Sequence, residues 1–341
     1  MHTLYSLFRP LLFAVDPETA HDIVFGALDA AAALGVAQLA TPRVRSWPVR
    51  VMGIEFPNRI GLAAGLDKNG AHLRGLATLG FGFLEAGTVT PRAQSGNPRP
   101  RMFRLESSQA LINRMGFNND GVDRFVENVA RSRYGGVLGV NIGRNADTPN
   151  ACAVDDYATC LEKVYAIATY VTVNVSSPNT KGLRDLQAED ALGSLLERLV
   201  ALRDALAQRH GRRVPLVVKI APDLDGNTIE AVARLLVRQR IDGVIATNTT
   251  VAREGLAYHR AADQAGGLSG RPLRERSTAV VRALALALDG ALPIIGVGGV
   301  FSAHDAREKI AAGASLVQLY TGLIYRGPVL VAECVEALAN G

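Results

Sequence analysis

The feature that most constrains this chain is a series of eight short apolar runs that begins near residue 60. These runs are rich in valine, isoleucine and leucine and are continuous rather than alternating, which is typical of strands buried on both faces of a parallel sheet. Segments with the 3.6-residue periodicity of helices separate them, such as Leu192–Leu206 and Ile229–Val237. The expected strands are Ile60–Ala64, Phe83–Val89, Gly136–Ile142, Tyr170–Ser176, Leu216–Ile220, Gly243–Thr247, Ile294–Val297 and Leu316–Tyr320.

Eight strand–helix units predict an α/β fold of the closed (β/α)8 TIM-barrel type rather than an open doubly wound sheet. An open sheet that binds a dinucleotide has a G-x-G-x-x-G pattern after its first strand. The nearest match here, Gly296 to Phe301, lies in the seventh unit and fails at its sixth position. A complete barrel needs roughly 250 residues, so this chain of 341 residues has about 90 that the barrel alone does not require.

Part of this surplus is the N-terminal segment, which predicts a small helical extension. One face of a first helix is marked by apolar residues at helical spacing, namely Leu4, Leu7, Phe8, Leu11 and Leu12. Pro10 is a point at which this helix could break. Asp16 followed by proline is typical of a helix start, and Gly35 of a helix end, so a second helix is expected over Pro17–Leu34.

The rest of the surplus falls in two places. Val49–Met52 and Ile54–Phe56 have the pattern of a short hairpin, which is expected to close the bottom of the barrel. Residues 90–119 form a long connection after the second strand, and within it Met102–Leu105 and Ala110–Asn113 are predicted to be small strands.

Composition and spacing exclude several classes of function. The formal net charge is +5, but the 37 lysines and arginines are scattered and do not form the stripe expected of a nucleic-acid-binding protein. The three cysteines have no C-x-x-C spacing, and the six histidines show no metal-binding spacing, so neither a disulfide framework nor metal catalysis is expected. No uncharged apolar run reaches 18 residues, and the N-terminus lacks the basic start of a signal peptide.

Polar residues collect where the expected strands end, which is the catalytic face of a barrel. Asn141, Asn174, Asn179 and Asn248 recur at these ends, and Asn113 lies in the adjoining loop. A single asparagine at a strand end is more often a turn residue than a ligand contact. Their recurrence on separate strands instead favours a flat ligand with alternating carbonyl and N–H groups, such as a cyclic imide or ureide.

Three further residues extend this site. Lys68 and Lys219 end two strands, where they could simply pair with acidic residues, or could stabilise an anionic substrate or a reduced cofactor. Glycines after the seventh and eighth strands could bind a phosphate through their N–H groups. With no suitable histidine, Ser177 is the candidate base, although a serine before Pro178 would ordinarily be a turn residue.

Six longer motifs carry a resemblance to a known family. They are Gly61–Gly70 (GLAAGLDKNG), Gly87–Arg92 (GTVTPR), Leu111–Asn119 (LINRMGFNN), Asn174–Asn179 (NVSSPN), Leu268–Leu273 (LSGRPL) and Ile295–Gly299 (IGVGG). Along nearly its whole length the chain resembles the class 2, quinone-dependent dihydroorotate dehydrogenases. The resemblance implies a barrel that uses FMN to oxidise (S)-dihydroorotate to orotate in pyrimidine biosynthesis.

The resemblance also implies roles for individual residues. Ser177 would take the proton from C5 while the hydride from C6 passes to flavin N5, and Phe117 and Thr180 would gate and relay that proton. FMN contacts are expected at Ala64, Gly65, Leu66, Asp67, Lys68, Thr88, Asn141, Asn174, Lys219, Thr247, Gly270, Gly299, Tyr320 and Thr321. Substrate contacts are expected at Lys68, Asn113, Arg114, Met115, Gly116, Phe117, Asn174, Asn179, Asn248 and Thr249.

The same resemblance gives residues 1–40 a role as a quinone-access and membrane segment, and residues 41–341 the role of the FMN-binding catalytic barrel. His21, Arg104 and Tyr320 are then expected near the quinone head, ubiquinone or a related compound. The expected location is the cytoplasmic side of a bacterial inner membrane, with peripheral attachment. Residues 1–40 carry one arginine against four acidic residues, so binding to lipid would be mainly hydrophobic.

Three alternatives compete with this interpretation. A class 1-like FMN barrel would use fumarate or NAD, but related class 1 enzymes have a cysteine as base where this chain has Ser177. A non-catalytic phosphate-binding barrel would not need two strand-end lysines with a base. A flavin barrel that modifies RNA should show a concentrated basic surface.

Overall fold

The computed structural model describes residues 4–37, 44–256 and 259–339. Its centre is a closed barrel of eight parallel strands in the order β10-β12-β13-β3-β4-β7-β8-β9. The strands are β3 (Ile60–Leu62), β4 (Phe83–Val89), β7 (Val137–Ile142), β8 (Tyr170–Asn174), β9 (Leu216–Ile220), β10 (Gly243–Ala246), β12 (Ile294–Val297) and β13 (Leu316–Leu319). These are the eight runs that the sequence predicts, and several end one or two residues earlier because the polar loops of the site begin there.

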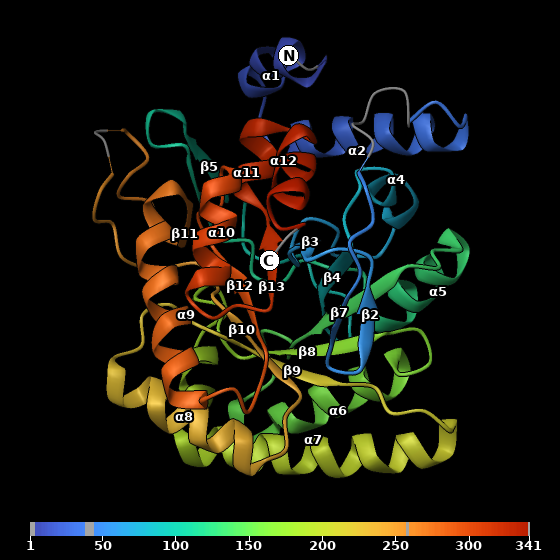
Figure 1. Ribbon diagram of the computed structural model, residues 1–341, viewed down its shortest axis with the longest axis vertical. Helices are drawn as coiled ribbons and strands as arrows, with labels where there is room; N and C mark the ends of the chain where they lie inside the picture. The colour runs from blue at the N-terminus through green and yellow to red at the C-terminus, as the bar shows by residue number, and fades with distance from the viewer. Residues whose placement is uncertain (1–3, 38–43, 257–258, 340–341) are drawn as a thin grey trace.

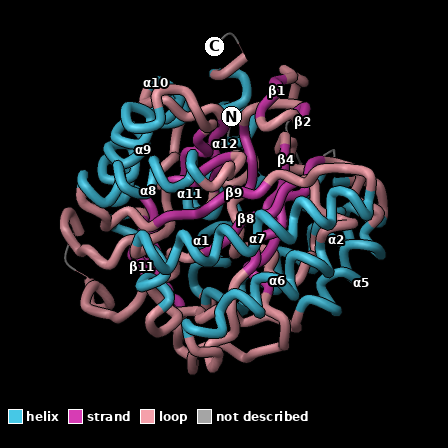
Figure 2. The backbone as a smooth tube through the Cα atoms, turned by 90° about the horizontal axis from the view of Figure 1, so that it is seen from below, coloured by secondary structure: helices cyan, strands magenta, loops and turns pink. Residues whose placement is uncertain are grey.

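Helices follow the strands and enclose the barrel, as the ring of cyan around the magenta strands in Figure 2 shows. They are α4 (Leu73–Ala77), α5 (Val122–Ser132), α6 (Ala153–Val164), α7 (Glu189–His210), α8 (Gly226–Arg238), α9 (Arg274–Leu288), α10 (Ala303–Ala311), α11 (Thr321–Arg326) and α12 (Val329–Ala337). Short 3₁₀ turns lie at Glu106–Ser108, Asn150–Cys152, Leu183–Gln187 and Arg271–Leu273. The predicted TIM barrel is therefore confirmed.

Large side chains fill the bottom of the barrel. A hairpin of β1 (Val49–Val51) and β2 (Ile54–Phe56) packs Phe56 against Phe83, with ring centroids 5.1 Å apart. A Cβ atom on Gly61 would lie 2.3 Å from the Phe83 ring, so only glycine leaves room for that ring. The predicted hairpin and its position at the barrel bottom are both confirmed.

The long connection after β4 forms a small sheet of its own. Its strands β5 (Met102–Leu105) and β6 (Ala110–Asn113) are the two that the sequence predicts. A third strand, β11 (Gly267–Gly270), joins them from the loop after β10 and pairs Leu268 with Ile112. The sequence does not predict β11, because it is four residues long and holds one large apolar residue between glycines.

Two N-terminal helices lie at one end of the molecule, at the top of Figure 1. The first, α1 (Leu4–Ala14), continues through Pro10 and packs on α11, where Tyr5 donates a hydrogen bond to the carbonyl of Ile324. The second, α2 (Pro17–Ala33), begins after Asp16, whose carboxylate accepts two backbone N–H bonds, and packs on α4. Among the described helices, none is long and apolar enough to cross a membrane.

Candidate active site

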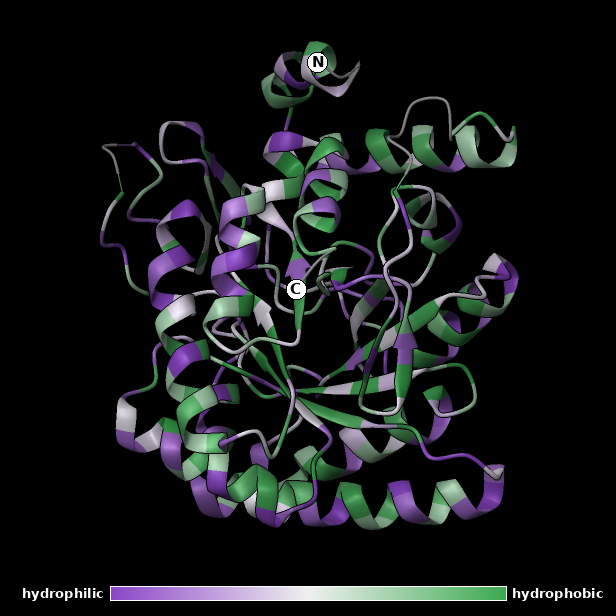
Figure 3. Ribbon diagram, viewed as in Figure 1, coloured by the Kyte–Doolittle hydropathy of each residue, from purple (hydrophilic) through white to green (hydrophobic). Residues whose placement is uncertain are grey.

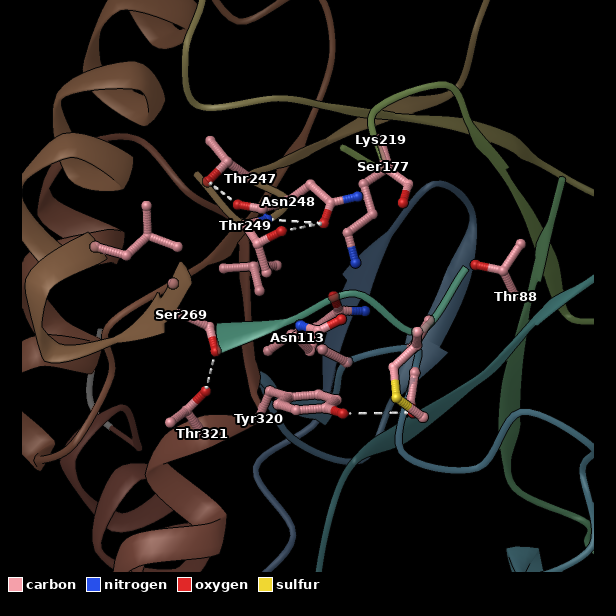
Figure 4. Close-up of a pocket in the computed structure, with 18 of the residues that line it drawn as sticks. Thr88, Asn113, Ser177, Lys219, Thr247, Asn248, Thr249, Ser269, Tyr320 and Thr321 are labelled. Atoms are coloured by element: carbon pink, nitrogen blue, oxygen red, sulfur yellow. Dashed lines mark hydrogen bonds between the residues drawn. The ribbon is translucent and has the colours of Figure 1, made fainter. Parts of the chain in front are cut away.

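A cavity opens at the carboxyl ends of the barrel strands, beneath the sheet of β5, β6 and β11. Residues from most of the barrel units line it. Figure 4 shows side chains from opposite sides of the barrel pointing into it. The predicted site residues that line it are Ala64, Gly65, Lys68, Thr88, Asn113, Met115, Gly116, Phe117, Asn174, Ser177, Asn179, Lys219, Thr247, Asn248, Thr249, Gly270, Gly299, Tyr320 and Thr321.

Other predicted residues lie behind the cavity wall, where they support it. Asp67 accepts backbone N–H bonds from Ala71 and His72 at 3.0 and 2.9 Å, which fixes the loop after β3. Arg114 faces away from the cavity, stacks over the Phe103 ring at 4.9 Å and donates to Gln264. The remaining predicted residues outside the lining are Leu66, Asn141, Thr180, His21 and Arg104.

The strand-end asparagines form two hydrogen-bonded groups. Asn174 donates to Thr88 Oγ1 and to Asn141 Oδ1, both at 3.0 Å. Asn248 donates to Ser176 Oγ at 2.9 Å. On the opposite side of the cavity, the amide of Asn179 donates to Asn113 Oδ1 at 3.1 Å. These bonds fix the orientation of amides that come from separate barrel units, so they present a fixed array of donors and acceptors to a flat ligand.

A buried carboxylate supports this array from inside the barrel. Glu85 on β4 is 1% exposed, and its Oε1 accepts the Asn141 amide at 2.8 Å. Its Oε2 accepts Gln318 Nε2 at 2.7 Å and the Tyr170 hydroxyl at 2.9 Å. Sequence reasoning missed Glu85 and Gln318, since both lie inside apolar runs. A charged residue in the middle of a buried strand was the signal that could have identified Glu85.

Two lysines bring positive charge to the cavity. Lys68 and Lys219 both line it, and within the described ranges neither ammonium group has a hydrogen bond or an ion pair. Burial lowers the pKa of Lys219, and the Glu85 carboxylate partly opposes that change. Burial also lowers the pKa of Lys68, to about 8. The alternative interpretation, in which these lysines are paired structural residues, therefore does not hold within the described chain. Both ammonium groups are free to face an anionic ligand.

Ser177 lies on the cavity wall between the two groups of asparagines, after the end of β8. It is 5% exposed, and its hydroxyl oxygen accepts the backbone N–H of Asn179 at 3.2 Å. Its hydroxyl hydrogen has no acceptor in the described chain. Thr180 follows Ser177 closely in the chain and is also buried. Its hydroxyl oxygen has no partner among the described residues. Neither hydroxyl hydrogen is therefore committed to an acceptor within the described chain.

The far wall of the cavity is formed by small residues. Gly298 and Gly299 both have positive φ angles, +120° and +72°, which turn the backbone toward the cavity without a side chain. Thr321 donates to Ser269 Oγ at 2.8 Å, as Figure 4 shows. Lining residues absent from the predicted set are Ala63, Ser269, Leu273, Val297, Gly298, Val300, Gln318 and Gly322. Five of them lie within the quoted motifs, which was the available signal: Ala63, Ser269, Leu273, Val297 and Gly298.

The residues predicted to surround a quinone head lie between the N-terminal helices and the barrel. His21 Nε2 is 2.7 Å from the carbonyl oxygen of Leu66, while the Tyr320 hydroxyl faces the neighbouring Gly65 carbonyl at 3.4 Å. Arg104 donates to the carbonyls of Phe13 and Val15, both at 2.8 Å, where α1 meets α2. Tyr320 also lines the cavity, so it connects the two regions.

Comparison with known proteins assigns the chain to a family. A family model described as dihydroorotate dehydrogenase matches residues 47–340. The chain belongs to the dihydroorotate dehydrogenase family. It is 64% identical over 337 residues to a protein named dihydroorotate dehydrogenase (quinone) from Thiobacillus denitrificans, covering 99% of this chain and all of that protein. A protein of the same name from Ralstonia nicotianae is 61% identical and is matched over the full length of both chains. The resemblance to the class 2 members is therefore confirmed.

Solved structures show the same fold. The dihydroorotate dehydrogenase of Eimeria tenella in complex with ferulenol superposes with a TM-score of 0.87 at 39% identity, over 95% of this chain and 90% of that chain. The ligand-free form of the same protein gives a TM-score of 0.85 over 95% and 94% of the two chains. These matches include part of the N-terminal segment as well as the barrel, because 95% coverage cannot be reached by the barrel alone.

Proposed function

We propose that this chain oxidises dihydroorotate to orotate through a bound FMN and passes the electrons to a quinone. The observation that carries the proposal is one cavity in which two unpaired lysines, Ser177 and four fixed asparagine amides face the same space. Relatives above 60% identity named dihydroorotate dehydrogenase (quinone) support the same reaction. The family is flavin-dependent, and FMN is the form we propose here.

The cavity residues fit FMN by their donor chemistry. Lys219 would offer a positive charge to a flavin ring, and Gly298, Gly299 and Thr321 would offer backbone N–H donors for a phosphate. Thr88 and Asn174 present fixed polar atoms to the ring edge. When bound, FMN would supply a hydride acceptor at N5. The remaining predicted contacts, Leu66, Asp67 and Asn141, would act from behind the wall.

The pyrimidine would bind between the flavin site and the small sheet. Asn113, Asn174, Asn179 and Asn248 would hold its carbonyl and N–H groups, and Lys68 would face its carboxylate. Ser177 would remove the C5 proton, and the free hydroxyl of Thr180 is a suitable carrier for that proton. Phe117 covers this side of the cavity and would exclude water.

Residues 1–40 would form the quinone and membrane segment, and residues 41–341 the catalytic barrel. Exposed apolar side chains concentrate on α1, α2 and the residues that follow each of them, and Figure 3 colours much of the ribbon of these two helices green. These side chains are Leu7, Phe8, Leu11, Val15, Ile23, Leu34 and Val36. Such a surface suits the outer layer of a membrane, and we propose peripheral attachment on the cytoplasmic side of the bacterial inner membrane.

Anaerobic mixing of the purified protein with dihydroorotate tests the proposal. We expect the bound flavin to lose its absorbance at once and to regain it when a quinone is added. Reoxidation by fumarate or NAD instead of quinone would favour a class 1-like enzyme. A flavin that dihydroorotate does not reduce would refute the proposed substrate, and a colourless protein that binds no FMN would refute the cofactor.

A further inference from the structure

An ion pair outside the cavity joins the first turn of α2 to the segment 94–117, which carries β5 and β6. Arg101 Nε donates to Glu18 Oε1 at 2.9 Å, and Arg101 Nη2 donates to Glu18 Oε2 at 2.8 Å. The two side chains are only 7% and 11% exposed. A buried bidentate pair of this kind is geometrically specific. Arg99 Nη2 also lies 3.1 Å from Glu18 Oε2, but the Arg99 side chain is 67% exposed. Loss of Arg101 therefore leaves the Glu18 carboxylate with one exposed partner, whereas loss of Glu18 leaves the buried Arg101 charge without an acidic partner among the described residues.

The remaining guanidinium nitrogen of Arg101, Nη1, forms hydrogen bonds within the segment 94–117. It donates to the carbonyls of Ser95 and Asn97, at 2.6 and 3.0 Å. The Asn97 amide in turn donates to the carbonyls of Arg114 and Asn179, at 2.8 and 3.2 Å. Two hydrogen bonds, from Arg101 to Asn97 and from Asn97 to Asn179, therefore connect Arg101 to the Asn113–Asn179 pair that faces the proposed pyrimidine site.

The same ion pair acts electrostatically on Lys68, the lysine proposed to face the substrate carboxylate. The charged groups around the Lys68 ammonium are Arg101, Glu18 and Asp22 from outside the cavity and Asp67 from its own loop. Burial is the main cause that lowers the pKa of Lys68 to about 8. Arg101 lowers it further, while Glu18, Asp67 and Asp22 raise it.

We propose that Glu18 and Arg101 are positioning residues for the pyrimidine site: their buried pair holds the segment 94–117 against α2 and balances the charge next to Lys68. This inference rests on the function proposed above. It makes the quinone segment a part of the substrate site, since Glu18 belongs to α2 while Lys68 belongs to the barrel. The ammonium of Lys68 must carry its proton to attract a carboxylate, so orotate affinity should fall as pH rises through the titration of Lys68.

Substitution of Glu18 and substitution of Arg101 should then shift the pH at which orotate affinity falls in opposite directions. Glu18→Gln leaves the Arg101 charge without its partner, which should lower the pH at which orotate affinity falls. Arg101→Gln leaves the Glu18 charge, partly offset by Arg99, and should raise that pH. A pair that only held two segments together would give the same loss of affinity in both variants, with no opposite shift.

The experiment is a titration of the full-length, flavin-loaded protein with orotate, followed by the flavin absorbance at pH values on both sides of about 8. At low pH, where Lys68 carries its proton, both Glu18→Gln and Arg101→Gln should bind orotate more weakly than wild type, because the segment 94–117 is no longer held. The pH at which affinity falls should be lower than wild type in Glu18→Gln and higher in Arg101→Gln. Arg101→Lys keeps the positive charge, so the pH at which orotate affinity falls should stay at its wild-type value. The matched controls are Glu189→Gln and Arg238→Gln, an exposed pair at 3.3 Å on α7 and α8, which should change nothing.

If the pH at which orotate affinity falls moves in the same direction in Glu18→Gln and Arg101→Gln, or does not move, the inference is overturned. If the buried variants lose their flavin, Asp22→Asn decides the electrostatic part, because Asp22 is 76% exposed and its loss leaves the buried pair intact. That variant should move the pH downward like Glu18→Gln, and an unchanged pH there would also overturn the inference. Wild-type protein that does not bind orotate would refute the proposed function instead.

Discussion

The amide of Asn141 donates a 2.8 Å hydrogen bond to Glu85, and both side chains are buried inside the barrel. This bond leaves the Asn141 oxygen to accept from Thr88 at 2.6 Å and from Asn174 at 3.0 Å. Because Glu85 as a carboxylate can only accept, it fixes which way the whole amide chain points. A residue that never touches the cavity thus determines which donors and acceptors the cavity presents.

Glu85→Gln tests this relationship. An amide at this position must place an NH₂ group against a donor, so we expect a loss of roughly 1–3 kcal/mol in the free energy of unfolding. Glu85 also raises the pKa of Lys219, so its loss should leave Lys219 less charged and make the midpoint potential of bound flavin more negative. Denaturant unfolding and redox-dye equilibration measure the two effects. Glu230→Gln, on the exposed face of α8, is the control, and equal behaviour of the two variants would contradict the prediction.

Ser177→Ala tests the proposed base. The Ser177 hydroxyl accepts only one backbone N–H bond, so its loss should leave the fold and the flavin in place. Reduction of the flavin by dihydroorotate should slow by roughly 10²–10⁴-fold, the usual contribution of general base catalysis. Stopped-flow absorbance measures this rate, and reduction by dithionite, which needs no base, is the control. An unchanged rate with dihydroorotate would remove Ser177 from the mechanism.

Leu7→Glu combined with Leu11→Glu tests the membrane segment. Both leucines are 69% exposed on α1, so two charges there should not disturb folding. The change removes apolar area that would otherwise enter lipid, and vesicle binding should weaken by more than about tenfold. Co-sedimentation with vesicles measures binding, while flavin reduction by dihydroorotate should be unaffected. Leu286→Glu, 78% exposed on α9, is the matched control, and a similar loss in that variant would argue against a specific membrane face.

Lys309 should make stability depend on pH. Its ammonium is buried and donates to the hydroxyls of Ser277 and Thr278, and burial lowers its pKa from 10.5 to about 7. Between these values the unfolded chain binds the proton that the folded chain has lost, so the free energy of unfolding should rise with pH from about 7 to 10.5. Lys309→Met should flatten that slope relative to wild type. Lys163→Met, 41% exposed, should leave the slope unchanged, and a slope that persists in Lys309→Met would contradict the prediction.

The barrel could be predicted because its strands are buried on both faces, and this burial requires continuous apolar runs such as Phe83–Val89 that are visible without the fold. The start of α2 could be predicted because Asp16 caps it through the next three residues, a purely local interaction. Continuation of α1 through Pro10 could not be predicted, since it depends on contacts of Tyr5 and Arg9 with α11, more than 300 residues away.

The residues of the candidate site likewise divide into those that the sequence predicts and those that only the structure reveals. The sequence by itself determined the barrel, the strand-end asparagines, the two lysines and Ser177, because the ends of parallel strands must meet on one face of a closed barrel. Only the tertiary structure decided that β11 completes the small sheet, that Glu85 orients the amides and that Glu18 reaches Arg101. Each of these joins segments far apart in the chain, and the energy of such a contact depends on distances that no local pattern encodes.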